Sequence, residues 1–220
     1  MSAKTKVTVD VVSDVVCPWC YVGKKHLEEA VRLRPDLDIE MRFLPYQLDE
    51  TIPEEGLPRR DYMMKKFGDE ARIEAIHDRL REVGRADNIP FAFEKITVSP
   101  NTLDSHRIIR WAAEAGVQPA VKDRLMRAYF TEGADLSDHA VLAKLAGEAG
   151  MVEAQVAEWL ETDNDKDAVR ADIQRARMMG VQGVPFFIID HAVGVSGAQP
   201  ADTLAQAIDY ALKQREKGAA

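Results

Sequence analysis

The hydrophobic pattern of the chain changes from strand-like to helix-like and back again. Residues 7–12 and 37–44 alternate apolar and polar side chains, which is the period of a β-strand, and the segment between them predicts a helix over 18–32. We expect the two strands to be parallel and their crossover to be right-handed, because β–α–β connections almost always have that hand.

Between about residues 59 and 180 the apolar positions recur almost entirely at helical spacing. The preceding segment, 47–60, is rich in Pro, Gly and acidic residues and predicts a linker loop. Gly180 is expected in the left-handed conformation just after the last of these helices. Polar residues are expected to cap two of the helices, namely Asn101 or Thr102 and, for a later helix, Ser137.

Strand-like sequence returns after residue 180. Residues 183–190 form a short apolar run, and 193–197 follow after a tight turn at 190–191, so the pair predicts a β-hairpin. A final amphipathic helix is expected to begin at Pro200.

This order of elements predicts an α/β fold. A β–α–β unit and a later β–β–α unit form a thioredoxin-like core, and an α-helical insertion interrupts it. We place residues 1–46 and 181–220 in the discontinuous thioredoxin-like domain, and residues 47–180 in the insertion domain.

Composition excludes several functional classes. The 220 residues are 46% hydrophobic and 30% charged, as in an ordinary globular protein. A net charge of −8 argues against a nucleic-acid partner, because phosphate binding needs a basic surface. The apolar runs are too short to cross a membrane, and Asp10 and Asp14 interrupt any signal-type stretch near the N-terminus. We therefore expect a cytoplasmic protein without a membrane partner.

The two cysteines of the chain form the motif Cys17-Pro18-Trp19-Cys20 between the first strand and the first helix. This order places Cys17 at a helix N-terminus, where unpaired N–H groups and the helix dipole favour a thiolate. Pro18 suits the first helical position, and Cys20 lies within disulfide reach of Cys17. The chemistry offered is thiol–disulfide exchange, in which Cys17 attacks and Cys20 resolves the mixed disulfide.

Three other roles for the cysteine pair compete with redox catalysis. A structural zinc site usually needs four protein ligands, and the five histidines do not supply a matching pair. A structural disulfide across so short a loop would constrain little of the unfolded chain. A non-catalytic interaction domain is disfavoured because the free pair is expected in an exposed motif.

Four segments in the same order resemble the DsbA-like thiol oxidoreductases of the FrnE-like branch. They are Ser13-Asp14 before the cysteine motif, Gly183-Val184-Pro185-Phe186-Phe187, Val195–Pro200, and Ser99–Arg107 with its Asn-Thr and His-Arg pairs. The resemblance covers nearly the whole chain. It implies a thioredoxin fold with inserted helices, dithiol chemistry, and neither a metal nor an organic cofactor.

The resemblance also implies roles for several residues. Val184–Pro185 matches the cis-proline that faces the cysteine motif, with the Val184 backbone offered to substrate. Asn101 is first a helix cap, and His106 either packs in the core or lines a groove above Cys17; the resemblance makes both candidates for substrate contact. The full predicted substrate-binding set is Pro18, Trp19, Val184, Pro185, Asn101 and His106. For Asp14, orienting the active-site loop and simple solvation both remain open.

Two functions therefore stand. One is a thiol–disulfide oxidoreductase acting on protein or low-molecular-weight disulfides, with oxidase, reductase and isomerase directions all compatible with the motif. The other is a glutathione-dependent isomerase or transferase of the 2-hydroxychromene-2-carboxylate isomerase or kappa-class type, with glutathione as co-substrate. Retention of Cys20 favours the first, since glutathione addition needs no resolving thiol. Monomer and homodimer both fit the sequence.

Overall fold

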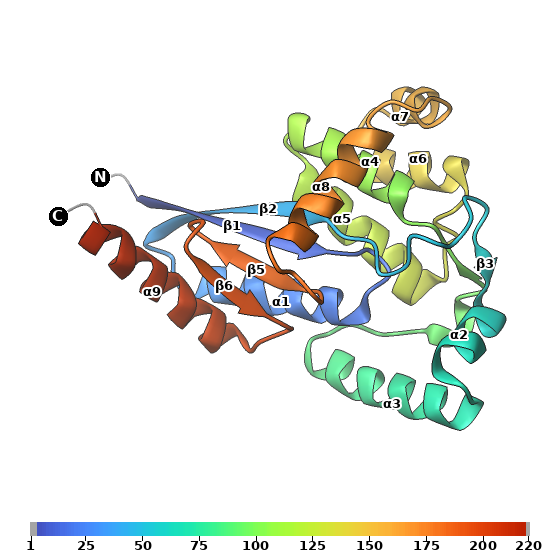
Figure 1. The fold of residues 1–220 in the computed structure, drawn as a ribbon, viewed down its shortest axis with the longest axis horizontal. Coiled ribbons are helices and arrows are strands. Elements are labelled where there is room, and N and C mark those ends of the chain that lie inside the picture. Colours follow the sequence, from blue (N-terminus) through green and yellow to red (C-terminus); the bar gives the residue numbers. More distant parts are fainter. Residues whose placement is uncertain (1–3, 219–220) are drawn as a thin grey trace.

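The computed structural model describes residues 4–218 and contains a four-stranded sheet in the order β2–β1–β5–β6 (Figure 1). Strand β1 (Thr5–Ser13) pairs in parallel with β2 (Leu37–Pro45), as predicted. On its other side β1 pairs antiparallel with β5 (Phe186–Ile189), which continues through a hairpin into β6 (Val193–Ser196). The sheet is therefore assembled from the two ends of the chain.

Helices make up most of the remaining structure. Two of them belong to the ends of the chain, namely α1 (Pro18–Arg32) and α9 (Ala201–Gly218). The segment between β2 and β5 contains β3 (Leu57–Pro58), α2 (Arg59–Phe67), α3 (Glu70–Ala86), η1 (Phe93–Lys95), β4 (Val98–Ser99), α4 (Leu103–Glu114), α5 (Gln118–Arg127), the π-turn η2 (Ala128–Glu132), α6 (His139–Glu148), α7 (Glu153–Leu160) and α8 (Lys166–Met178). The chain is thus an α/β thioredoxin-like fold with a helical insertion between strands, as the order of elements predicted.

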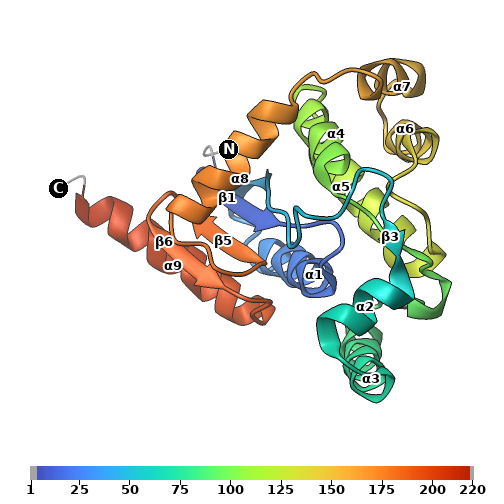
Figure 2. The ribbon, with the colours of Figure 1, turned by 45° about the vertical axis from the view of Figure 1, so that its right-hand side comes forward.

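Helices cover both faces of the sheet. Figure 2 shows α1 and α9 on one face, where they pack against each other, and α8 on the other. The side chains of β1 follow this arrangement: Val7 and Val9 enter the main core, whereas Val12 packs with Ala176 and Val181 at the end of α8. A strand buried on both faces explains why β1 is so apolar.

An aromatic cluster joins the insertion to the start of α1. The ring of Tyr21, one residue after the cysteine motif, stacks on Phe130 at a centroid distance of 6.1 Å and meets the edge of Phe91 at 6.3 Å. Phe91 and Phe130 in turn meet edge to face at 5.4 Å. One continuous apolar core therefore spans the sheet and the insertion, and it fixes the insertion beside the cysteines.

Most local predictions are confirmed. Gly180 follows α8 with φ +86°, and Asp190 and His191 both have positive φ, as a two-residue hairpin turn requires. Asn101 and Thr102 were the two candidate caps of α4. Thr102 occupies the N-cap position, but the side chain that accepts the capping hydrogen bond is that of Asn101, whose Oδ1 lies 3.0 Å from the backbone nitrogen of Leu103.

Three local predictions need correction. Asp138, and not Ser137, caps α6: its carboxylate accepts from two backbone N–H groups, whereas the Ser137 hydroxyl lies 2.5 Å from the Asp135 carboxylate and 3.2 Å from the Glu55 carbonyl, both acceptors outside the helix. The expected linker loop 47–60 ends early, because β3 pairs with β4 and α2 begins at Arg59. The strand expected at 183–190 is limited to β5, because proline at 185 has no N–H for the ladder.

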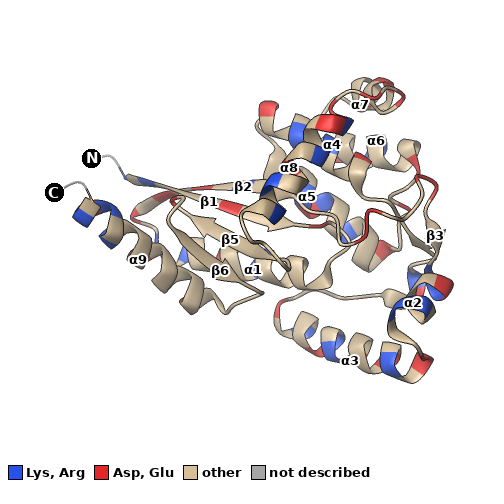
Figure 3. Ribbon diagram, viewed as in Figure 1, with Lys and Arg blue, Asp and Glu red and all other residues tan. Residues whose placement is uncertain are grey.

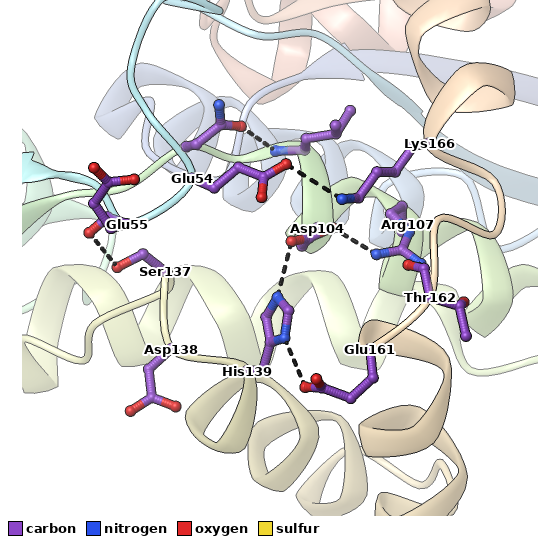
Figure 4. Close-up of polar contacts among 12 residues, drawn as sticks. Glu54, Glu55, Asp104, Arg107, Ser137, Asp138, His139, Glu161, Thr162 and Lys166 are labelled. Atoms are coloured by element: carbon purple, nitrogen blue, oxygen red, sulfur yellow. Dashed lines mark hydrogen bonds and ion pairs between the residues drawn. The ribbon is translucent and has the colours of Figure 1, made fainter.

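A polar cluster that extends from the buried Arg107 to the exposed Glu161 connects the outer helices of the insertion. Figure 4 shows Asp104 of α4 between Arg107 and His139, with Glu161 on the other side of the imidazole. His139 lies 3.1 Å from a carboxylate oxygen of each acid. Partial burial would lower the pKa of His139, but the hydrogen bonds and charges of Glu161 and Asp104 outweigh it and raise the pKa above 6.5.

This cluster predicts a pH-dependent contribution to stability. A raised folded-state pKa means that His139 stabilises the fold fully below its unfolded pKa of about 6.5, and that this contribution disappears as pH rises through the folded pKa. In urea unfolding between pH 5.5 and 9, wild type should exceed His139→Gln most at the acidic end, and the two should converge at the alkaline end. A stability difference that did not change with pH would contradict this account.

Candidate functional site

Cys17 lies at the N-cap of α1, as the sequence predicts. Its backbone is extended (φ −93°, ψ 110°), and its Sγ accepts a hydrogen bond from the N–H of Cys20 at 3.3 Å. Pro18 occupies the first turn of the helix, where no N–H partner is lost. The Cys17 sulfur therefore meets the positive end of the α1 dipole.

The loop before β5 faces this sulfur. The Val184–Pro185 peptide is cis, as predicted, and the Cys17 Sγ lies 3.6 Å from the carbonyl oxygen of Val184. Gly23, two turns into α1, makes the approach possible: a Cβ there would lie 2.8 Å from the Cγ of Pro185. The helix and the proline loop thus meet without a side chain between them.

The cysteines are less exposed than the sequence led us to expect. Cys17 is 4% and Cys20 1% exposed, so the expectation of an exposed pair is wrong. Burial has a physical cause: both residues belong to the main apolar core, against which the partly buried Val184 also packs. Trp19 remains on the surface with 37% exposure, consistent with its predicted role as a contact residue.

Lys122 is a site residue that sequence reasoning missed. It lies in α5, is 1% exposed, and its charge interacts with those of Cys20, Asp14 and Cys17. Burial lowers the pKa of Lys122 to about 8, although these three neighbours act in the opposite direction. A buried ammonium group beside two thiols is the main electrostatic feature of the site.

The environment of Cys20 keeps its thiol protonated. Burial raises the pKa of the Cys20 thiol well above its ordinary value, the neighbouring Cys17 sulfur raises it further, and the charge of Lys122 lowers it. Formation of the Cys20 thiolate therefore depends on what Lys122 contributes.

We predict from this that Lys122→Met slows attack by Cys20 on a mixed disulfide held by Cys17. Loss of the positive charge raises the pKa of the Cys20 thiol, and each unit lowers the thiolate fraction about tenfold. In stopped-flow release of a thiol from the preformed mixed disulfide, measured from pH 6 to 9, the variant should be slower than wild type by the largest factor below pH 8, and the two profiles should approach each other toward pH 9 as Lys122 itself loses its proton. Lys144→Met removes the same charge from the exposed face of α6 and should leave the profile in place. Coincident profiles for wild type and Lys122→Met would exclude the role.

Asp14 and His106 form a second buried pair near the motif. The Nε2 of His106 lies 3.3 Å from Asp14 Oδ1 and 3.0 Å from the carbonyl oxygen of Tyr46; both partners are acceptors, so this nitrogen carries the proton. The other Asp14 oxygen accepts from the N–H of Leu48 at 2.9 Å.

The ionisation of this pair follows from burial and contact. Burial would raise the pKa of Asp14, but His106, the Leu48 N–H and Lys122 together lower it. Burial lowers the pKa of His106, in spite of Asp14. An Asp14 carboxylate and a neutral His106 therefore connect the residue 46–48 loop to the turn before Cys17, which makes Asp14 an orienting residue and not a solvated one.

The predicted substrate-binding residues divide into two groups. Pro18, Trp19, Val184 and Pro185 belong to the motif or the facing loop. Asn101 lies elsewhere, and its amide is occupied by Gln47, the Ile52 carbonyl and the Leu103 N–H. His106 is buried behind Asp14. Contact of Asn101 or His106 with substrate stays a prediction, and their observed contacts are structural.

A partly open cavity of about 130 Å³ lies beside the motif. Asp14, Val16 and Pro18 form its wall on the side of the cysteines, and residues of α2 and α3 form much of the opposite wall. Among residues 4–218, no three His, Cys, Asp or Glu side chains are grouped to hold a metal ion, and no helix is long and apolar enough to span a membrane.

Comparison with known proteins agrees with this geometry. A model of the DSBA-like thioredoxin domain matches residues 8–209. The chain is 28% identical over 210 residues to YwbO of Bacillus subtilis (strain 168), covering 95% of this chain and 99% of that protein.

Two solved structures have a similar fold. The probable DsbA oxidoreductase SCO1869 from Streptomyces coelicolor is 32% identical, with a TM-score of 0.87 over 94% of this chain and 90% of that one. A putative protein disulfide isomerase from Nitrosomonas europaea is 18% identical, with a TM-score of 0.73 over 95% and 98%; at this identity the likeness concerns the fold. With the model match covering most of its length, and with the cysteine motif and the cis-proline loop facing each other, the chain belongs to the DSBA-like thioredoxin domain family.

Proposed function

We propose that this protein is a thiol–disulfide oxidoreductase of the FrnE-like branch that uses Cys17 and Cys20. The observation that carries the proposal is the Cys17 sulfur at the N-terminus of α1, 3.6 Å from the Val184 carbonyl of the proline loop. A sulfur nucleophile at a helix N-terminus, with a second thiol three residues later, is the arrangement that disulfide exchange requires. The name of the 32% identical relative, a probable DsbA oxidoreductase, supports the same activity.

The exchange has two balanced steps. The Cys17 thiolate attacks one sulfur of a substrate disulfide; a bond forms between Cys17 Sγ and that sulfur, and the other substrate sulfur leaves as a thiolate and takes a proton. Cys20 then loses its proton and attacks Cys17 Sγ, releasing the second substrate thiol. The substrate disulfide is reduced and the Cys17–Cys20 disulfide is formed; in the reverse direction a dithiol is oxidised.

Other residues assist these steps without exchanging sulfur. Lys122 stabilises the Cys20 thiolate in the second step, because its buried charge lowers the pKa of that thiol. The Val184 backbone and the exposed Trp19 contact the substrate. Pro185 leaves this strand end without an N–H, so an extended substrate can pair beside it.

We assign the choice of substrate to the insertion, residues 47–180, and the chemistry to the two ends of the chain. Its partners are proteins or low-molecular-weight compounds that carry thiols or disulfides. The alternative glutathione-dependent isomerase or transferase needs no resolving thiol, so the buried Cys20 next to Lys122 favours exchange.

The test is the redox equilibrium of the cysteine pair against a glutathione buffer, run beside a glutathione-conjugation assay. We expect the protein to move between dithiol and intramolecular disulfide as the buffer ratio changes, followed by alkylation and mass spectrometry. A protein that formed no Cys17–Cys20 disulfide, but conjugated glutathione to an electrophile, would favour the alternative.

A further inference from the structure

The cavity beside Pro18 has a composition that a disulfide-exchange site alone does not explain. Helices α2 and α3, which supply much of its wall, lie together beside the N-terminal end of α1 (Figures 1 and 2). Much of the lining is apolar: Ile52, Met63, Phe67, Ile76, Leu80 and Phe93. Its enclosed volume of about 130 Å³ is comparable to that of an apolar cavity of about 150 Å³ that admits one benzene ring, so the cavity can hold one aromatic ring with the rest of a ligand at its mouth.

Arg59 gives the cavity an uncompensated positive charge. Its Nη1 donates to the Tyr129 hydroxyl at 3.1 Å and to Ser99 Oγ at 3.4 Å, and both partners are neutral. Within the described part of the chain, no carboxylate lies within 4 Å of the Arg59 guanidinium. The next residue, Arg60, is different: it is exposed and pairs with Glu70.

One further group leaves the cavity ready for a polar ligand. It is not Lys66, which donates to the Tyr62 hydroxyl at 2.9 Å and whose charge acts on the Asp49 carboxylate. His77 stacks on Phe93 at 4.2 Å, and its buried Nε2 has no hydrogen-bond partner among residues 4–218. Helix α2 carries four basic residues and one acid, Asp61 (blue and red in Figure 3), so Arg59 lies at the start of a predominantly basic helix.

The acidic groups of the cavity do not cancel this charge. Asp49 accepts from the backbone N–H and the hydroxyl of Thr51 at 3.0 and 2.6 Å. Asp14 is engaged by His106 and the Leu48 N–H. The N–H groups of the Arg59 guanidinium can bind a carboxylate, and the apolar walls can bind the aromatic or other apolar part of the same ligand.

We propose that this cavity binds small molecules with an apolar, preferably aromatic, body and a carboxylate, with the carboxylate on Arg59. The binding site itself does not depend on the proposed function, but its use for substrates does. Val16 and Pro18 form one wall of the cavity, so a disulfide of this class bound there lies beside Cys17. Such disulfides are the preferred low-molecular-weight substrates.

Binding can be tested without redox chemistry. In the Cys17→Ser protein, isothermal titration with biphenyl-4-carboxylate and with its neutral amide compares ligands of nearly equal shape. We expect the acid to bind about tenfold more tightly, as a charged hydrogen bond provides. Arg59→Gln should remove the preference, Arg59→Lys should retain part of it, and Arg60→Gln should leave it unchanged. Ile76→Trp, which fills the cavity, should weaken both ligands.

The substrate aspect needs a second measurement with intact cysteines. We compare kcat/KM for 5,5′-dithiobis(2-nitrobenzoate), an aromatic acid disulfide, with that for neutral 4,4′-dithiodipyridine. Arg59→Gln should lower the ratio of the two about tenfold, and Arg60→Gln should not.

The two measurements separate the proposals. Equal binding of acid and amide, or a preference that survives in Arg59→Gln, would overturn the cavity assignment. Arg59-dependent binding without turnover of either disulfide would support the cavity site and contradict the proposed function.

Discussion

Cys17→Ser is expected to reduce disulfide exchange to the rate of the uncatalysed reaction. Serine keeps the N-cap position and nearly the volume of cysteine, but its hydroxyl does not attack a disulfide at neutral pH. The measurement is turnover of a small aromatic disulfide under a thiol reductant, with thermal unfolding to verify the fold. Lys144→Met serves as the control, since it changes an exposed side chain of α6 outside the site and should leave turnover unchanged. Turnover of Cys17→Ser above background would exclude Cys17 as the nucleophile.

Arg107→Met is expected to cost about 3–5 kcal/mol of unfolding free energy, the largest stability loss that we predict. The side chain is 0% exposed, donates to Asp104, and also donates to three carbonyl oxygens in the last turn of α7 and the loop that follows, those of Trp159, Thr162 and Asn164. Methionine fills most of the space of the arginine side chain, but it leaves the three carbonyl oxygens and the Asp104 carboxylate without the donor that they share.

The control for this prediction is Arg110→Met on the same helix. Arg110 is exposed and pairs with Asp165 and Asp172, so its loss should cost less than about 1 kcal/mol. Urea unfolding of the two variants compares them directly. Equal losses would show that the buried carbonyls find other partners.

The fold could be predicted because its signals are local. Alternation along β1 and β2, a proline at the first turn of α1 and a two-residue turn at 190–191 each determine backbone geometry within a few residues. The connection rules then make β1 and β2 parallel, as they are. The prediction of a Ser137 cap is wrong because neighbouring Ser and Asp can both cap, and the Asp135 carboxylate and the Glu55 carbonyl engage the Ser137 hydroxyl instead.

The surroundings of the cysteines could not be predicted, because they depend on residues distant in sequence. Lys122 lies about a hundred positions from the motif, and a lysine in an amphipathic helix ordinarily predicts solvent. Only the folded structure, in which α5 packs on α4, α6 and β2, reveals its burial. The Asp14–His106 contact is equally long-range. Arg59 is another example, since its lack of a carboxylate partner among residues 4–218 is a property of the folded chain.

The central claim, that Cys17 attacks and Cys20 resolves, is tested most directly by trapping. Cys20→Ser is mixed with a peptide that contains one disulfide, quenched with acid, digested and mapped by mass spectrometry. The account predicts a stable mixed disulfide on Cys17, in yield that approaches one per protein, while Cys17→Ser accumulates none. A mixed disulfide on Cys20 of the Cys17→Ser protein, with none on Cys17 of the Cys20→Ser protein, would contradict it.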